Sequence, residues 1–353
     1  MFHTLIRGLA AVLALLSPVS YALAQTPIQV ELDAPFAHEG SGITVPSSID
    51  RFDRTSVTDF TDEQLNIAIH LREASGETTL TLFIYRAATP NLSIWGDFAA
   101  LAMVNNPSVG SLVSGSYFLG RFTPPNASGD GAALHARALL EGGKARSTGL
   151  SIFAHNDWIV KLRATSQTLS DDQITAVMGK VLAAIKMEPS ETTYPPVTFV
   201  EACEKPLKFK KNLVTKRLDI FNRLSMALAA NAVEIAKSTS DRADKPWCRD
   251  AQSTIDYGVY REAGTDRSYF VALSDAGVGA YVSRFRTTLI NTRFSGFLVK
   301  TSNGITEEAW PLYDKRVHPA FIVSRYGAMT PIATLDVRPG AEPTSTIVIP
   351  PGT

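Results

Sequence analysis

The sequence has little cysteine and no excess of charge of either sign. Its 353 residues include two cysteines, 34 basic and 34 acidic side chains, so the formal net charge is zero. Nucleic-acid-binding proteins usually carry a basic excess, so this balance argues against nucleic acid as a partner. With 45% hydrophobic residues, the chain is too apolar for a disordered protein. The length predicts about two domains, each able to bury a core of its own.

The local signatures of common enzymes and cofactor sites are absent as well. The sequence contains no Gly-x-Ser-x-Gly, Walker loop, His-Glu-x-x-His, Gly-x-Gly-x-x-Gly or Cys-x-x-Cys-His. We therefore expect no cofactor and no metal. Catalytic triads assemble from residues that are distant in sequence, so a hydrolase stays open as an alternative.

The longest apolar run lies at the start of the chain. Residues 9–16 are apolar without interruption, Arg7 is the only strong cation before them, and Ala22-Leu23-Ala24 follows after Ser17-Pro18. This order is typical of a secretory signal peptide, and we expect residues 1–24 to be removed before Gln25. The run is too short for a membrane span, which needs roughly 20 apolar residues. We expect a bacterial periplasmic or secreted protein that does not span the membrane.

The two cysteines fit that compartment. Cys203 and Cys248 lie 45 positions apart, and in an oxidising space an even pair is expected to form a disulfide. Two cysteines without histidines at ligand spacing cannot complete a tetrahedral zinc site. A catalytic cysteine would leave its partner as an unexplained thiol, so the sequence favours the disulfide.

The chain divides at a proline-rich stretch. We expect an N-terminal domain over 25–187, a Pro-rich linker over 188–197, a C-terminal domain over 198–338 and a flexible tail over 339–353. The predicted fold class is α+β, with two domains that are each a mostly antiparallel sheet packed with helices.

Hydrophobic periodicity predicts the individual elements. In the first domain the expected strands are 65–72, 80–85, 149–154 and 158–165, and the expected helices are 91–104, 132–141 and 170–186. Ser170 and Gln173 form a capping box at the last helix. In the second domain a long amphipathic helix over 211–237 should precede strands at 253–261, 268–273, 278–285, 294–301 and 320–326.

The order of elements in the first domain resembles the PsbP/Mog1 class of small α/β sandwich proteins. The resemblance rests on Ile43-Thr44-Val45-Pro46, on residues 80–85 and 158–165, and on the closing helix 170–186. The long loop over 105–131 departs from a compact version of that fold. The class consists mostly of accessory proteins without catalysis, so the resemblance implies an accessory role.

Two histidines are weak candidates for catalysis. In His155-Asn156-Asp157 a histidine adjoins a carboxylate, as a general base would require, but Asn-Asp is also ordinary hairpin-turn chemistry. His135 is the second candidate, with an unidentified serine as the nucleophile. The remaining histidines of the mature chain lack a second ligand at metal spacing and are expected to be structural or solvated; they are His38, His70 and His318.

A basic run opens the second domain. It consists of Lys205, Lys208, Lys210, Lys211, Lys216 and Arg217, and no acid interrupts it. Such a run can dock an anionic envelope surface, or it can be the solvated start of a helix. Only Phe209 interleaves it, which argues against the stacking of nucleic-acid bases.

These observations predict a non-catalytic exported protein that binds a small ligand or an envelope protein. The alternative is a secreted hydrolase whose site lies between the domains. The motive for the first is the export signal together with sheet-containing domains that show no converging reactive groups.

Overall fold

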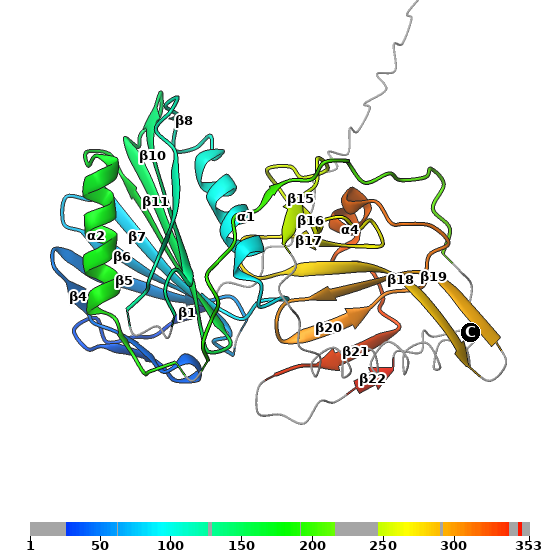
Figure 1. Ribbon diagram of the computed structural model, residues 1–353. Coiled ribbons are helices and arrows are strands. Elements are labelled where there is room, and N and C mark those ends of the chain that lie inside the picture. Colours follow the sequence, from blue (N-terminus) through cyan, green and yellow to red (C-terminus); the bar gives the residue numbers. More distant parts are fainter. Residues whose placement is uncertain are drawn as a thin grey trace, which may run out of the picture.

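The computed structural model describes residues 26–61, 63–125, 129–190, 192–215, 246–289, 292–338 and 345–347 (Figure 1). The predicted signal peptide, most of the predicted helix 211–237 and most of the predicted tail lie outside these residues, as do Lys216 and Arg217. Within the described residues the chain forms two large sheets and one small sheet.

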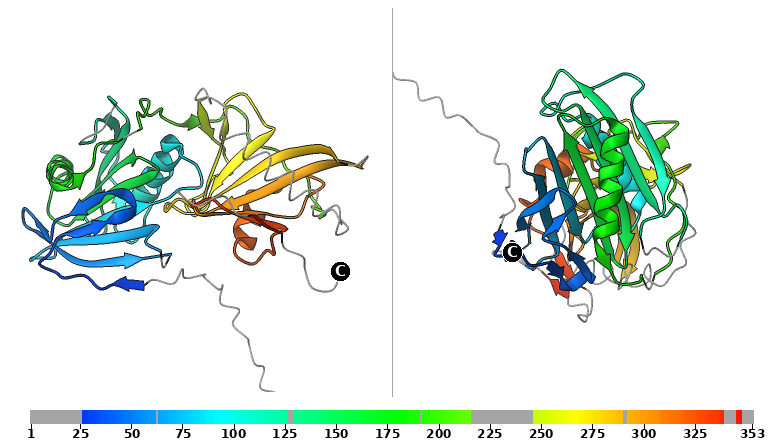
Figure 2. Two further views of the ribbon diagram at one scale, coloured as in Figure 1. Left: turned by 90° about the horizontal axis from the view of Figure 1, so that it is seen from below. Right: turned by 90° about the vertical axis from the view of Figure 1, so that its left-hand side faces the viewer.

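The first large sheet is antiparallel throughout. Its strands follow the order β1 (Thr26–Ile28), β5 (Phe52–Asp59), β6 (Asn66–Glu73), β7 (Thr78–Tyr85), β12 (Trp158–Ser166), β11 (Ser147–His155), β10 (Ala133–Glu141) and β8 (Ser111–Leu112). Two further strands pair beside this path, β4 (Ser48–Ile49) with β5 and β9 (Phe118–Phe122) with β10. Helix α2 (Asp171–Ala184) lies across one face of this sheet (Figure 2), and helix α1 (Leu92–Val104) lies toward the second half of the molecule (Figure 1).

The small sheet lies beside the first large sheet. It joins β13 (Lys186–Met187), β3 (Ile43–Val45) and β2 (Phe36–His38), and a short 3-10 turn, η1 (Glu39–Ser41), follows β2. Ile43, Val45 and Met187 pack into the same core as α2 and the first sheet. The small sheet therefore closes one end of that core.

The second large sheet belongs to the C-terminal half. Its strands follow the order β14 (Glu201–Ala202), β15 (Trp247–Arg249), β16 (Gly258–Glu262), β17 (Ser268–Ala272), β18 (Gly279–Leu289), β19 (Thr292–Ser302), β20 (Thr306–Ala309), β21 (Ala333–Asp336) and β22 (Ser345–Ile347). Only β14 and β15 pair in parallel among the described strands. Helix α4 (Pro319–Arg325) contributes Ile322 to the core on this sheet.

The predicted α+β class is wrong, because antiparallel sheets dominate and the helices are short. The predicted helix 132–141 is strand β10, which pairs with β11 on one side and with β9 on the other. Its alanines and leucines favour a helix locally, but they are buried at alternate positions between these neighbours, and tertiary pairing overrides propensity.

Two predictions in the C-terminal half are wrong as well. The strand expected at 320–326 is α4, which begins with Pro319 after the N-cap His318, whose side chain accepts the N–H of Ala320. Residues 211–215, the expected start of the long helix, are not helical in the described structure.

Several local predictions are confirmed. The expected strands 65–72, 80–85, 149–154 and 158–165 correspond to β6, β7, β11 and β12. The capping box is present at α2: the Ser170 hydroxyl accepts the N–H of Gln173, and the Gln173 side chain accepts the N–H of Ser170. In these elements the local sequence pattern and the burial in the folded chain favour the same secondary structure.

The two halves share a core and an ion pair whose lysine is buried. One cluster unites Ile94 and Trp95 of α1 with Tyr260 and Phe270 of the second sheet. Lys161 of β12 is almost fully buried, and its Nζ lies 3.1 Å from Asp275 Oδ2 in the loop between β17 and β18. The Lys161 ammonium lowers the pKa of that carboxyl. Apolar packing and this ion pair together fix the position of one half relative to the other.

Candidate functional site

Helix α1 lies between the two large sheets and contacts both. Asn91 caps it by accepting the N–H of Ile94. Ala99 and Met103 pack against β10 and β11, whereas the Trp95 ring meets Phe270 of β17 edge-to-face at 5.7 Å. Because apolar residues occur on more than one side of α1, the helix can be buried from both directions.

Gly96 allows α1 to approach the first sheet closely. A Cβ atom at this position would lie 2.3 Å from Cδ1 of Leu134 in β10, which is far inside van der Waals contact. Glycine weakens a helix by about 1 kcal/mol relative to alanine. At this position the close approach explains why glycine is present.

A groove of about 460 Å³ opens between α1 and the loop that joins β15 to β16. The lining residues are Phe98, Leu101, Ala102 and Asn105 on one side, and Arg249, Ser253, Thr254 and Ile255 on the other. Most of the α1 wall is apolar, whereas the opposite wall carries a guanidinium and two hydroxyls. The volume of the groove lies in the range of small-molecule sites, and its lining is nearly as polar as it is apolar.

Asp97 holds the guanidinium of Arg249 in place. Arg249 Nη1 lies 2.6 Å from Asp97 Oδ1, and the Tyr260 hydroxyl donates to Asp97 Oδ2 at 2.9 Å. Burial raises the pKa of Asp97, and Arg249 opposes that rise. Burial also raises the pKa of Tyr260 well above its ordinary value, so its hydroxyl stays a donor. Among the described residues, Asp97 is the one acceptor that bonds the Arg249 guanidinium, so its other N–H groups can reach a ligand.

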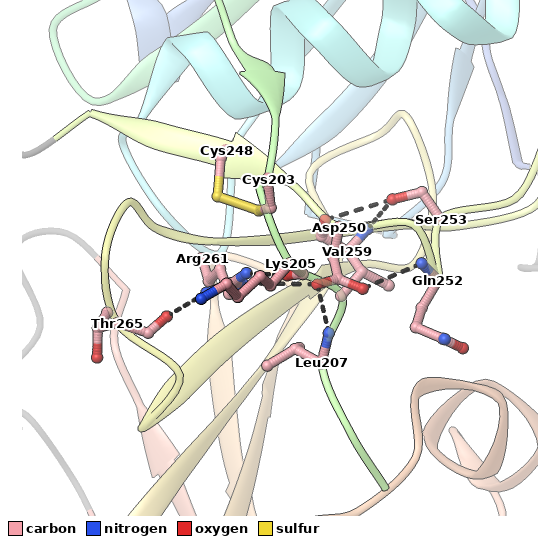
Figure 3. The surroundings of a disulfide bond; sticks show 10 residues. All are labelled: Cys203, Lys205, Leu207, Cys248, Asp250, Gln252, Ser253, Val259, Arg261 and Thr265. Atoms are coloured by element: carbon pink, nitrogen blue, oxygen red, sulfur yellow. Dashed lines mark hydrogen bonds and ion pairs between the residues drawn. A yellow bond between two sulfur atoms is a disulfide. The ribbon is translucent and has the colours of Figure 1, made fainter.

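The predicted disulfide is confirmed and lies next to Arg249. Cys203 and Cys248 are bonded, with 4.9 Å between their Cα atoms (Figure 3). The bond connects Cys203, directly after β14, with Cys248 of β15. Arg249 is the next residue and the last one of β15. The disulfide therefore restrains the strand that presents the guanidinium to the groove.

Asp250, the residue after Arg249, orders the chain that follows β15. Its side chain is fully buried and accepts the N–H of Leu207 at 2.8 Å and the N–H of Gln252 at 3.1 Å (Figure 3). Its Oδ2 also lies 3.5 Å from Arg261 Nε. These contacts order the start of the loop that carries Ser253 and Thr254, so the polar wall of the groove is built in advance.

His155 and Asp157 do not form a catalytic pair. They flank Asn156, which has φ 51° in the turn between β11 and β12. The side chain of His155 is buried, whereas Asp157 is exposed and lies 3.5 Å from Arg86. Burial lowers the pKa of His155. No described hydrogen bond or ion pair joins the two side chains, and neither lines the groove.

His135 is placed on a strand and not on the predicted helix. From β10 its Nδ1 lies 3.1 Å from the Ser151 hydroxyl, and its Nε2 lies 3.2 Å from the Thr175 hydroxyl on α2. The His38 Nδ1 lies 2.7 Å from the Ser41 hydroxyl, and both side chains are buried. Burial lowers the pKa of both histidines. Both contacts join packed elements and lie away from the groove.

The described lysines of the basic run are exposed. Lys205, Lys208, Lys210 and Lys211 follow the disulfide along an extended segment and do not line the groove. In the described part of the chain no group of three or more histidine, cysteine, aspartate or glutamate residues could hold a metal ion. None of the described helices is long and apolar enough to cross a membrane.

Comparison with protein-family models, curated proteins and solved structures found no match for this chain. The resemblance of the first half to the PsbP/Mog1 class therefore stays a prediction from the sequence.

Sequence reasoning missed the groove residue Arg249 and its partner Asp97. One feature could have drawn attention to Asp97: it is the only charged residue in the 13-residue helix α1. Charged groups are seldom buried without a partner. Nothing in the sequence, however, identifies Arg249 as that partner, since it is 152 positions away.

Proposed function

We propose that this chain is an exported, non-catalytic binding protein of the cell envelope, and that the groove beside α1 holds a small anionic amphiphile. The observation that carries the proposal is the pairing of an apolar wall with Arg249. Phe98, Leu101 and Ile255 suit an alkyl chain or a ring, whereas the N–H groups of Arg249 suit a carboxylate or sulfonate.

The direct test is a titration with decanoate, with decan-1-ol as the uncharged comparison. Wild-type protein is expected to bind decanoate more tightly than decan-1-ol: Asp97 offsets the charge of Arg249, but the N–H groups of Arg249 that Asp97 does not bond can donate charge-assisted hydrogen bonds to the carboxylate. Replacing Ala102 by tryptophan places an indole in the groove. We expect decanoate affinity to fall about tenfold or more, since the ligand and the indole compete for one volume. Isothermal calorimetry measures both quantities.

Ala183→Trp is the matched control. Ala183 is an exposed helical alanine on α2, so the same substitution there should leave decanoate affinity unchanged. If the Ala102 and Ala183 variants bound decanoate equally well, or if wild-type protein had equal affinity for decanoate and decan-1-ol, the proposal that the groove binds an anionic amphiphile would be wrong. Turnover of simple ester, peptide or phosphoester substrates that alanine at one groove residue abolishes would contradict the non-catalytic role.

Export has its own test, which does not depend on the ligand. Residues 1–24 have the pattern of a signal peptide, and the disulfide is typical of an oxidising compartment. We expect protein isolated from its native cells to begin at Gln25 and to resist thiol alkylation until it is reduced. Intact mass spectrometry after alkylation distinguishes this from a chain that retains Met1 and two reactive thiols.

A further inference from the structure

The segment from Cys203 to Thr215, here called the strap, crosses the second half of the molecule as an extended chain. In Figure 1 it is the green trace that follows β14 along the upper outline of that half. Three of its apolar side chains face the core: Leu207 is buried, and Leu213 and Phe209 are half-buried. The Phe209 ring centre lies 4.6 Å from that of His318. Alternation along the strap turns Lys208 and Lys210 toward solvent, and Lys205 and Lys211, at either end of the run, are exposed as well.

Three cations anchor the strap through its backbone carbonyls. Arg261 donates to the carbonyl of Lys205, Arg316 to that of Lys208 at 3.1 Å, and Lys315 to that of Lys211 at 3.3 Å. Each anchor also has an acid of its own: Asp250 lies 3.5 Å from Arg261, Asp266 lies 3.4 Å from Arg316, and Asp314 lies 3.5 Å from Lys315. The charge of each anchoring side chain is thus paired with an acid outside the strap.

The four lysines of the strap have no such partners among the described residues. Lys205, Lys208, Lys210 and Lys211 are exposed, and none is in an ion pair with another described residue. Glu204 precedes the run, and no acid occurs within residues 205–215. Lys205 and Lys211 are six positions apart, which corresponds to roughly 20 Å of extended chain, so the four lysines are spread over about that length. The result is a local excess of positive charge on a chain whose net charge is zero.

We propose that the lysine face of the strap docks this protein onto an anionic lipid surface. A line of separate ammonium groups on an outer edge suits a plane that carries many single charges, and each lysine near such a plane contributes attraction of its own. The exposed Val214, at the end of the line, adds an apolar side chain that the interface can accept. The proposal does not depend on the ligand of the groove.

Other anionic partners fit the strap less well. A site for a single phosphate needs converging donors, but the N–H of Leu207 is taken by Asp250, and the lysines lie in a row. Single-stranded nucleic acid needs exposed aromatic side chains for stacking, and Phe209 packs against Tyr269 and His318. An anionic polysaccharide is the alternative partner, and the experiment compares it with the lipid surface.

The test is co-sedimentation of the mature protein with phosphatidylglycerol-containing vesicles and with neutral phosphatidylcholine vesicles. Wild-type protein is expected to bind the anionic vesicles only, and binding should weaken as the salt concentration rises from about 0.05 M to about 0.3 M. Replacing Lys208 and Lys210 by glutamine should lower the partition coefficient about 25-fold, which is about fivefold for each lysine.

A double variant with the same loss of charge is the control. Lys144 and Lys186 are exposed on the first half, and their replacement by glutamine should leave the partition coefficient unchanged. Binding to neutral vesicles, equal losses in the two double variants, or no sedimentation at low salt would overturn the proposal. So would displacement from vesicles by inorganic phosphate at constant ionic strength, or tighter binding to soluble heparin than to vesicles.

Discussion

Replacing Asp275 by alanine is expected to destabilise the protein by about 3 kcal/mol. The substitution leaves the Lys161 ammonium, which is 1% exposed, without its carboxylate. We take the lower end of the range for a broken buried pair because Lys161 still donates to the backbone carbonyl of residue 275. Urea unfolding at neutral pH measures the change in the free energy of unfolding.

Two further variants show whether the buried charge is the cause. Lys161→Met together with Asp275→Ala should recover much of the lost stability, since the apolar side chain can lie against Phe83 without an unpaired charge. Lys180→Ala breaks the ion pair with Asp50, in which both side chains are exposed, and should cost less than about 0.5 kcal/mol. If the Asp275 and Lys180 variants had the same stability, the ion pair between Lys161 and Asp275 would not be what secures the two halves.

Removal of the disulfide is expected to cost about 4 kcal/mol. In the chain-entropy description, a crosslink between residues 45 apart restricts the unfolded chain by about this amount. The double variant Cys203→Ser/Cys248→Ser should therefore unfold at lower urea concentration than oxidised wild-type protein. The spectroscopic change on unfolding gives both midpoints.

Reductant supplies the internal comparison for the disulfide. Reduced wild-type protein should unfold at nearly the same urea concentration as the serine variant, and reductant should not affect the variant. Equal midpoints for oxidised wild-type protein and the variant would show that the bond between β15 and the strap adds no stability.

Local sequence rules predicted those helices and strands whose local sequence preference matches the burial that they have in the folded chain. The capping box at Ser170 defines the start of α2, and the alternation in β6 and β7 matches one buried face. The predicted helix 132–141 failed for the opposite reason. Strong helix formers lie there between two partner strands, and only the folded chain brings those partners together.

In the basic run, Leu207, Lys208, Phe209 and Lys210 alternate as in an extended chain. Of the two interpretations of the run, the start of a helix does not fit the described residues 211–215, which are not helical. The groove could not be predicted from the sequence, because Asp97 of α1, which holds the groove residue Arg249, is distant in sequence from Arg249 and Tyr260 of the second sheet. Contacts of that range depend on how two sheets pack, which no local pattern specifies.

The most direct test of the groove as the binding site is methyl-detected NMR of the mature protein during a decanoate titration. Our account predicts that the methyl resonances of Leu101 and Ile255 shift in a saturable manner, because both side chains line the groove. The methyl resonances of Ile322, which is buried where α4 packs on the second large sheet, should not move. Shifts confined to other regions, or no saturable shift at Leu101 and Ile255, would contradict the proposal that this groove binds the ligand.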